Sequence, residues 1–165
     1  MKTRAHELID TLQLQPHPEG GWFREDFRSA TQVQSLDARP QRSALTSIYF
    51  LLEADQHSHW HRVLSDEVWV YLEGDALNLW SWNALDQVAI CTQLGPVNTN
   101  TGQRPQNTIA AGLWQAAWPT DAALHGYTLL ACMVGPGFDF SDFSMLEESS
   151  DAAVQMRLAG LPGWD

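Results

Sequence analysis

Between residues 43 and 143 the chain is a succession of short segments rich in β-branched and aromatic residues, and this pattern constrains the fold most strongly. The segments are SALTSIYFLLE, SHWHRV, DEVWVYLE, ALNLWSW, QVAICTQL, GLWQAAW, YTLLACMV and FDFSDF. Turn sequences separate them, such as Glu73-Gly74-Asp75 and Gly95-Pro96. Because this spacing leaves no room for the helical crossovers of a parallel sheet, we predict an antiparallel sandwich or barrel of about eight strands.

Helix patterns occur only near the two ends of the chain. AHELIDTLQL carries apolar residues near a helical period and is followed by Pro16, which predicts a helix over about 5–14. Ser149 or Ser150 is suited to cap DAAVQMRLA, a helix over about 150–159 that Gly160 closes. We predict a single domain over 1–165, with the barrel over about 20–145 and a polar loop over 28–42.

The net charge excludes two classes of partner, and the cysteine positions exclude a metal or redox motif. The net charge of −11 repels nucleic acid and anionic membranes, so neither is expected as a partner. Cys91 and Cys132 match neither a metal pattern nor a redox pair, and both are expected to be buried free thiols. No apolar run approaches the roughly 20 residues that span a bilayer, so we expect a cytoplasmic protein. In the N-terminal part, Trp22, Phe23 and Phe27 are also expected to be buried.

The densest group of chemically active residues is HSHWHRVLSDEVWVYLEG, residues 57–74. Since side chains alternate along a strand, His59 and His61 are expected to share one face. After a tight turn at 63–66, Glu67 begins a returning strand and can meet them. Metal binding, proton transfer and a merely polar end of the sheet all remain open for this cluster.

Aromatic residues offer a second candidate feature. The chain has eight tryptophans, and Trp60, Trp69 and Trp114 either pack in the core or wall a pocket for a flat or sugar-like ligand. His6, His17 and His125 lie in an expected helix or expected loops, and we assign them no role at a site.

The stretch HWHRVLSDEVWVYLEG resembles the first signature of the cupin superfamily. In that signature H-x-H, a glutamate and a glycine that ends a hairpin lie at the mouth of a small double-stranded barrel. The interval from Glu67 to Gly74 is the usual one. The interval from His61 to Glu67 is one residue longer, so Asp66 stands where the strict spacing places the acid.

Further stretches extend the likeness: PHPEGGWFRE, SALTSIYFLL, SHWHRVLSDEVW, AAGLWQAAW and GYTLLACMVGPGFDFSDF. Over roughly residues 5–145 they resemble the cupin_5 family, within the sugar-epimerase-like cupins. The resemblance implies an all-β double-stranded β-helix, the jelly-roll cupin barrel, with short flanking helices. It also implies a homodimer, which would cover the open sheet edges.

Metal-binding cupins take a fourth ligand, a histidine, from a late strand, whereas the corresponding stretch here offers only His125. The remaining set, His59, His61 and Glu67, matches the two-histidine, one-carboxylate pattern of open metal sites. We therefore favour no metal or other cofactor, and a divalent metal held by these three residues is the alternative.

Without a metal, the chain resembles the metal-free sugar-nucleotide epimerases of the superfamily. His61 would be the base, Asp66 or Glu67 its orienting partner, and Tyr71 or Tyr127 the acid.

The turn PEGG lies near the barrel mouth in cupin_5 proteins, which implies that Glu19 either contacts a ligand or is simply a turn residue. His59, Trp69, Trp114 and Tyr127 complete the expected ligand-binding set. Arg24 and Arg62 are rare cations in an acidic chain, and Arg24 is a candidate to hold a phosphate or carboxylate, with a surface ion pair as the alternative.

Three functions remain open from the sequence. The first is a small-molecule-binding cupin with isomerase or epimerase chemistry on a carbohydrate or similar polar metabolite. The second is a metal-dependent cupin enzyme, and the third is a ligand-binding or sensing module without catalysis. Whether the protein is an enzyme is therefore left undecided at this point, and the expected partner is a small molecule.

Overall fold

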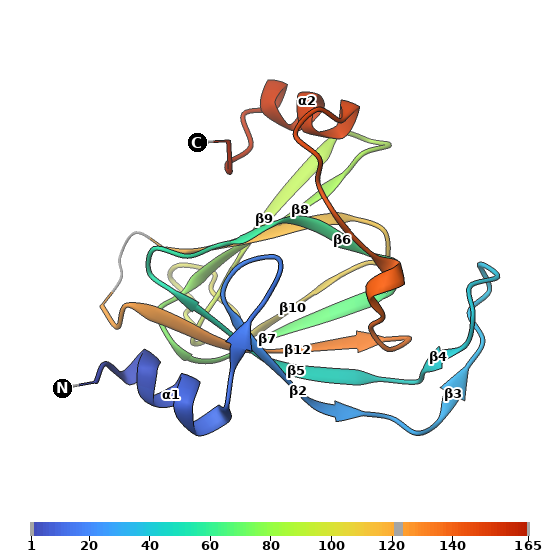
Figure 1. The fold of residues 1–165 in the computed structure, drawn as a ribbon. Coiled ribbons are helices and arrows are strands. Elements are labelled where there is room, and N and C mark those ends of the chain that lie inside the picture. Colours follow the sequence, from blue (N-terminus) through green and yellow to red (C-terminus); the bar gives the residue numbers. More distant parts are fainter. Residues whose placement is uncertain (1, 121–123, 165) are drawn as a thin grey trace.

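The computed structural model describes residues 2–120 and 124–164, and it folds into two facing antiparallel sheets (Figure 1). The six-stranded sheet has the order β1-β2-β5-β12-β7-β10 and the five-stranded sheet the order β13-β6-β11-β8-β9. The first comprises β1 (Gln15–Pro16), β2 (Trp22–Arg28), β5 (Thr46–Glu53), β12 (Tyr127–Gly135), β7 (Asp66–Gly74) and β10 (Gln106–Ile109). The second comprises β13 (Phe143–Met145), β6 (Ser58–Val63), β11 (Trp114–Pro119), β8 (Leu77–Asn83) and β9 (Val88–Leu94). The predicted jelly-roll barrel is confirmed.

The core lies between the two sheets because each contributes one apolar face. Phe50, Trp69 and Leu130 from the six-stranded sheet pack with Leu79 and Ala117 from the five-stranded sheet, and all five are almost fully buried. At roughly 25 cal/mol per Å² of apolar surface, such burial is the main stabilising contribution to the barrel.

Both flanking helices cover outer faces of the barrel. Helix α1 (Arg4–Leu12) is capped by Thr3 and packs Ala5 and Leu8 near Leu51 of the six-stranded sheet. Helix α2 (Asp151–Leu158) is capped by Ser150 and buries Met156 against a tryptophan cluster on the five-stranded sheet. That cluster contains Trp60, Trp82 and Trp114. No helix in the two described ranges is long and apolar enough to cross a membrane.

Some local expectations are wrong. Residues 22–28 form strand β2, whose outer part leaves Phe27 50% exposed, so Phe27 is not buried as expected. The polar stretch 28–42 is not only a loop, because β3 (Gln32–Val33) and β4 (Arg42–Ser43) pair there as a short arm. Cys132 is buried, whereas Cys91 is exposed, because β9 is an edge strand.

A short 3-10 helix, η1 (Phe140–Asp142), interrupts what the sequence indicated as a final strand. It begins after Asp139, whose side chain accepts a hydrogen bond from the Ser141 amide, and it leads directly into β13. In Figure 1 this turn lies at one end of the barrel, between the two sheets. It is therefore placed to border whatever space the sheets enclose there.

Candidate functional site

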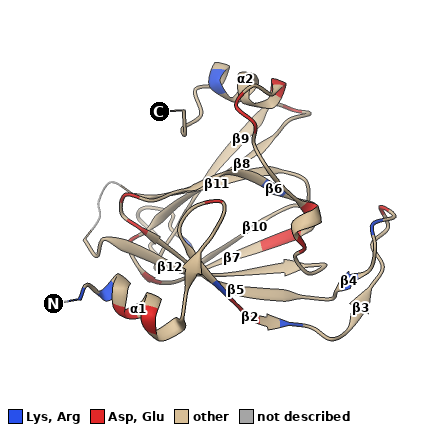
Figure 2. Cartoon of the chain, in the orientation of Figure 1, with Lys and Arg blue, Asp and Glu red and all other residues tan. Residues whose placement is uncertain are grey.

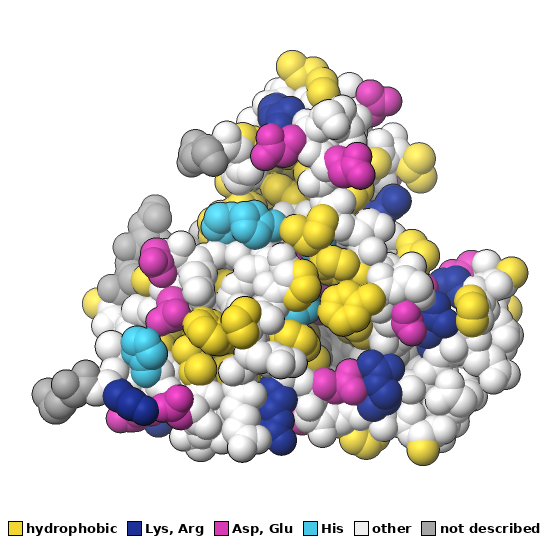
Figure 3. Space-filling model, viewed as in Figure 1, with side chains coloured by type: hydrophobic (Ala, Val, Ile, Leu, Met, Phe, Trp, Pro, Cys, Tyr) yellow, Lys and Arg dark blue, Asp and Glu magenta, His cyan; other side chains and the backbone are white. Residues whose placement is uncertain are grey.

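A cavity of about 280 Å³ opens at this end of the barrel, lined by strands of both sheets, the loop before β2 and the segment 138–140. In the space-filling view, hydrophobic side chains gather around a hollow on this face (Figure 3). The inner end holds Glu19, His61 and Glu67, each at most 7% exposed. The volume lies just below the roughly 300–1,000 Å³ range of ligand pockets, which suits a molecule of about one ring.

A bulge in β6 decides which side chains of the H-x-H motif face the cavity. In the pairing with β11, Gln115 lies opposite His61 and Ala117 opposite Ser58, so β6 carries one extra residue between these two positions. The bulge breaks the alternation of the strand. Ser58 and His61 both point inward, whereas His59 is exposed and pairs with His57 on the surface, Nδ1 to Nε2, at 3.1 Å. The expectation that His59 and His61 share a face is therefore wrong.

Glu19 enters the cavity from the tight loop at 17–21. Gly20 and Gly21 adopt φ values of 106° and 69°, and the backbone of Gly20 lies close to the His57 carbonyl. The His59 amide donates to the Glu19 carbonyl at 2.7 Å, which fastens the loop to β6. The two glycines thus allow the tight turn that places Glu19 in the cavity.

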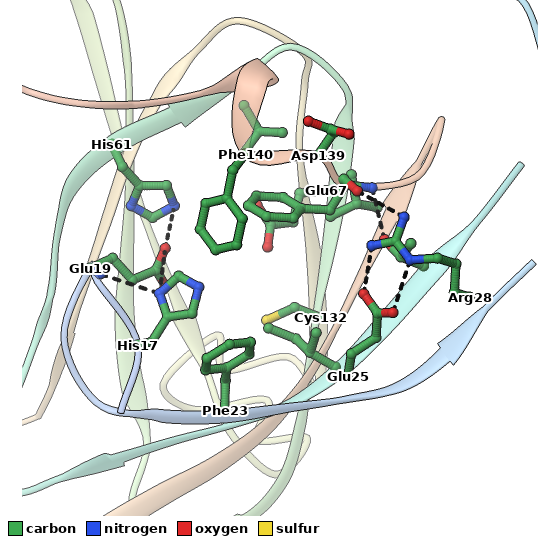
Figure 4. A pocket seen from close by; sticks show the side chains of 15 residues that line it. His17, Glu19, Phe23, Glu25, Arg28, His61, Glu67, Cys132, Asp139 and Phe140 are labelled. Carbon is green, nitrogen blue, oxygen red and sulfur yellow. Dashed lines mark hydrogen bonds and ion pairs between the residues drawn. The ribbon is translucent and has the colours of Figure 1, made fainter. Parts of the chain in front are cut away.

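Glu19 and His61 form a buried acid-base pair. The Glu19 Oε2 to His61 Nε2 distance is 3.1 Å, and His61 Nδ1 lies 2.8 Å from the His59 carbonyl oxygen (Figure 4). That carbonyl can only accept, so Nδ1 carries the proton. Burial raises the pKa of Glu19 to about 8, although the hydrogen bond from Ser58 acts in the opposite direction. Burial lowers the pKa of His61. Near neutral pH the Glu19 carboxyl is therefore protonated and donates to Nε2.

Glu67 is held by a fixed chain of hydrogen bonds behind it. The Trp69 indole donates to Gln115 Oε1 at 3.0 Å, and Gln115 Nε2 donates to Glu67 Oε2 at 2.6 Å. Because an indole nitrogen can only donate, the orientation of the Gln115 amide follows from it. Burial raises the pKa of Glu67 to about 7. The strand register decides which of the two neighbouring acids faces the cavity. Glu67 lines the cavity, whereas Asp66 is exposed and accepts a hydrogen bond from the Ala111 amide.

His17, to which the sequence assigned no role, also lines the cavity. Its Nδ1 accepts a hydrogen bond from the Glu19 amide at 3.2 Å, and burial lowers the pKa of His17 to about 4. The ring is therefore neutral at physiological pH and presents Nε2–H as a donor. It packs edge-on against Phe23 at 4.5 Å between centroids. The only indication in the sequence that His17 lines the cavity was its position in the same tight loop as Glu19.

The outer end of the cavity combines charged and aromatic side chains that the sequence did not single out. Arg28 forms two hydrogen bonds to Glu25, at 2.9 and 2.7 Å, along β2. Asp139 and the 56% exposed Phe140 border the opening from the η1 side. These residues come from parts of the chain about 110 positions apart, and only the tertiary fold brings them together.

Several predicted site residues lie elsewhere. Arg24 is exposed and donates to the Leu12 carbonyl at the end of α1, and Arg62 lies 4.9 Å from the centroid of Trp114. Trp114 belongs to the tryptophan cluster under α2, outside the barrel, and Trp69 stands behind Glu67 as a hydrogen-bond donor. The proposed ligand roles of Arg24 and Trp114 have no support in this geometry, because both face away from the cavity.

The two tyrosines considered as acids are engaged outside the cavity. Tyr71 donates to the Gly74 carbonyl at 2.7 Å, within the last residues of β7. Tyr127 donates to Glu73 and packs beside α1. Neither lines the cavity. The proposed role of these tyrosines as the acid has no support in this geometry, and among the described residues the titratable groups that line the cavity beside the histidines include carboxyl groups but no tyrosine.

The ligand set implied for a metal does not fit this site. His59 points to the surface while His61 and Glu67 face the cavity, so the three donors do not converge. Across residues 2–120 and 124–164, no group of three or more His, Cys, Asp or Glu side chains has the arrangement of a metal site.

Two solved structures are similar to the chain over nearly its whole length. A hypothetical protein from Leishmania major has 34% sequence identity and a TM-score of 0.82, covering 96% of this chain and 93% of that one. A protein from Shewanella oneidensis has 31% identity and a TM-score of 0.81, covering 97% and 94%. Oxalate decarboxylase from Bacillus subtilis, at 15% identity and a TM-score of 0.55, covers 89% of this chain but 34% of its own length, and shares the fold.

No curated protein matches the chain. A family model described as Cupin superfamily (DUF985), Cupin_5, matches residues 6–146. This range contains the loop of Glu19, the bulged strand of His61 and the η1 turn, and hence the whole lining of the cavity. The chain therefore belongs to the Cupin_5 family of the cupin superfamily.

Proposed function

We propose that the cavity binds a small carbonyl compound of about one ring and that its buried end moves protons on that compound. The reaction class is isomerisation or epimerisation, as in the sugar-epimerase-like cupins. The observation that carries the proposal is the pairing of Glu19 with His61 at 3.1 Å, with Glu67 buried in the same cavity. Two acid groups with pKa values of about 8 and about 7 are suited to give and take protons near neutral pH.

In this proposal the Glu67 carboxylate takes the proton from the carbon beside the carbonyl group. The C–H bond breaks, its electron pair forms the carbon–carbon double bond of an enol, and the carbonyl oxygen takes the proton shared by Glu19 and His61. To give the epimer, the enol turns in the cavity so that the Glu67 carboxyl returns the proton to the opposite face of the same carbon, and the enol oxygen gives its proton back to the Glu19–His61 pair. To give the isomer, Glu67 returns the proton to the former carbonyl carbon, and the hydroxyl group on the neighbouring carbon gives its proton to that pair. In this scheme the Glu19–His61 pair is the acid and Glu67 is the base, whereas the sequence indicated His61 as the base and a tyrosine as the acid.

Solvent deuterium exchange tests this proposal on a whole panel of candidate substrates. The protein is incubated in D₂O with small aldoses, ketoses and amino sugars, and proton NMR follows the loss of the C–H signal beside the carbonyl group. We expect exchange with at least one compound, and loss of exchange in Glu67→Gln and His61→Gln. Saturable binding without exchange in the wild-type protein would contradict catalysis and favour a ligand-binding or sensing module.

A further inference from the structure

The cavity lining is unusually acidic for a space with phenylalanine walls. Of the described residues that line it, Glu19, Glu25, Glu67 and Asp139 carry carboxyl groups, and Arg28 alone carries a guanidinium group. The whole chain has the same bias, with a net charge of −11, and Figure 2 shows acidic positions on strands of the six-stranded sheet, on loops and on both helices. Such a field attracts cations and repels anions over long range.

The Arg28 guanidinium group is already paired with a carboxylate. Its guanidinium group donates to both carboxylate oxygens of Glu25 and to the Phe138 carbonyl at 3.1 Å. These bonds use three of the five N–H groups of the guanidinium, and Glu25 balances its positive charge, so an incoming carboxylate or phosphate would compete with Glu25. Among the described lining residues, the outer end of the cavity therefore offers an anionic ligand no positive charge that lacks a carboxylate partner.

Asp139 is the carboxylate at the opening that has a free oxygen. Its Oδ1 accepts hydrogen bonds from the amide and the hydroxyl group of Ser141, at 2.9 and 2.6 Å. Within the described ranges, Oδ2 accepts none of the hydrogen bonds found. The bonds to Ser141 lower the pKa of Asp139, so this group is ionised at neutral pH. It presents a negative charge next to an apolar wall.

That wall consists of phenylalanine rings in contact with one another. Phe138 and Phe140 meet edge to face at 5.0 Å, and Phe140 and Phe143 do so at 6.1 Å. Phe140 is 56% exposed beside the opening, so its ring is accessible to a ligand. An aromatic face together with a carboxylate is the combination that recognises organic ammonium groups.

We propose that the cavity binds a small organic cation, a protonated amine on an apolar or ring-shaped body, with its charge at Asp139 and Phe140. This inference concerns the same cavity as the proposed function and names the class of its substrate. The body of the amine would extend inward between Phe23 and Phe138 toward Glu67 and the Glu19–His61 pair, which remain free for proton transfer. Anionic compounds such as sugar phosphates and sugar nucleotides are excluded by the same charges.

The preference for a cation should increase with pH. At pH 6 Glu19 and Glu67 are protonated, since their pKa values are about 8 and about 7, and Asp139 carries the unpaired negative charge. At pH 8.5 both glutamates are ionised, and their negative charges add to that of Asp139. The titratable and charged groups that face the cavity are His17, Glu19, Glu25, Arg28, His61, Glu67, Cys132 and Asp139.

Binding of matched compounds that differ only in charge tests the inference. Isothermal titration calorimetry and NMR shift titration at pH 6 would compare benzylamine, benzyl alcohol and benzoate, and likewise glucosamine, glucose and glucuronate. We expect the amine of at least one series to bind about tenfold more tightly than its alcohol, and the carboxylates not to bind. Asp139→Asn, which keeps the hydrogen bonds to Ser141, should remove this advantage. Glu148→Gln changes the net charge equally, at a 90% exposed side chain of a distant segment, and should not.

The outcomes separate this inference from the proposed function. Equal or tighter binding of the alcohols, binding of a carboxylate, failure of every amine to bind, or an unchanged preference in Asp139→Asn would each overturn the cation class. Deuterium exchange on a neutral sugar, combined with any of these results, would leave the proton-transfer function standing. A clear amine preference without any exchange would leave the cation site standing and reject catalysis.

Discussion

At the scale of single residues, the buried carboxyl groups should make stability depend on pH. Burial raises the pKa of Glu19 to about 8 and of Glu67 to about 7, so the folded state retains protons that the unfolded state releases above about pH 4.5. These groups therefore stabilise the fold at low pH, and the contribution is lost as pH rises toward 8. The lowered pKa values of His17 and His61 act in the opposite direction, but only below about pH 6.5.

We expect Glu19→Gln to flatten the pH dependence between pH 6.5 and 8. At about 1.4 kcal/mol per pH unit, Glu19 alone costs the wild-type protein about 2 kcal/mol of unfolding free energy across this window. Urea denaturation at the two pH values measures the loss, and Glu148→Gln serves as the exposed control. An equal loss in Glu19→Gln and the wild-type protein would show that Glu19 ionises normally.

A second residue-scale prediction concerns the hydrogen-bond chain behind Glu67. Gln115→Met removes the donor to Glu67 and the acceptor for the Trp69 indole, and both are buried. We expect a loss of about 2–4 kcal/mol in unfolding free energy, together with a further rise in the pKa of Glu67 observed by carbon NMR. The same change at the exposed Gln106 should cost less than about 0.5 kcal/mol. A comparable loss at both positions would argue against a specific role of this chain.

At the scale of elements, the loop of residues 17–21 should tolerate no side chain at Gly20. A Cβ atom there would lie 2.2 Å from the His57 carbonyl oxygen, and φ is 106°. We expect Gly20→Ala to cost at least about 3 kcal/mol and to displace Glu19 and His17, which weakens ligand binding. Gly102 also has a positive φ, but a Cβ atom there would have no neighbour within 4 Å, so Gly102→Ala should cost only about 1 kcal/mol.

Thermal unfolding of the two alanine variants measures the loss of stability, and amine titration measures the loss of ligand binding. Loss of stability alone in Gly20→Ala, with unchanged binding, would mean that the loop does not position the cavity residues. Similar losses in Gly20→Ala and Gly102→Ala would mean that backbone conformation, and not the close approach to His57, sets the cost.

At the scale of the whole molecule, we expect the chain to form a homodimer. The five-stranded sheet ends at β9, an edge strand with Val88 and Ile90 more than 50% exposed, and natural proteins usually cover or blunt such edges. Sedimentation equilibrium should give about twice the chain mass of 18.5 kDa. Ile90→Lys should shift the protein toward the monomer, while Leu158→Lys on α2 should not. A wild-type protein that sediments as a monomer would refute the expectation.

The barrel and its flanking helices could be predicted from the sequence, because short β-rich segments, turn sequences and helix caps act locally along the chain. The family followed from the resemblance of ordered motifs to cupin_5 proteins. Two of these motifs also indicated Glu19, His61 and Glu67. The composition of the cavity, in contrast, depends on the folded structure. One extra residue in β6 turns His59 outward, and strand register selects Glu67 over Asp66. His17, Arg28 and Asp139 meet through contacts between distant segments, and no pattern in the neighbouring residues encodes such contacts.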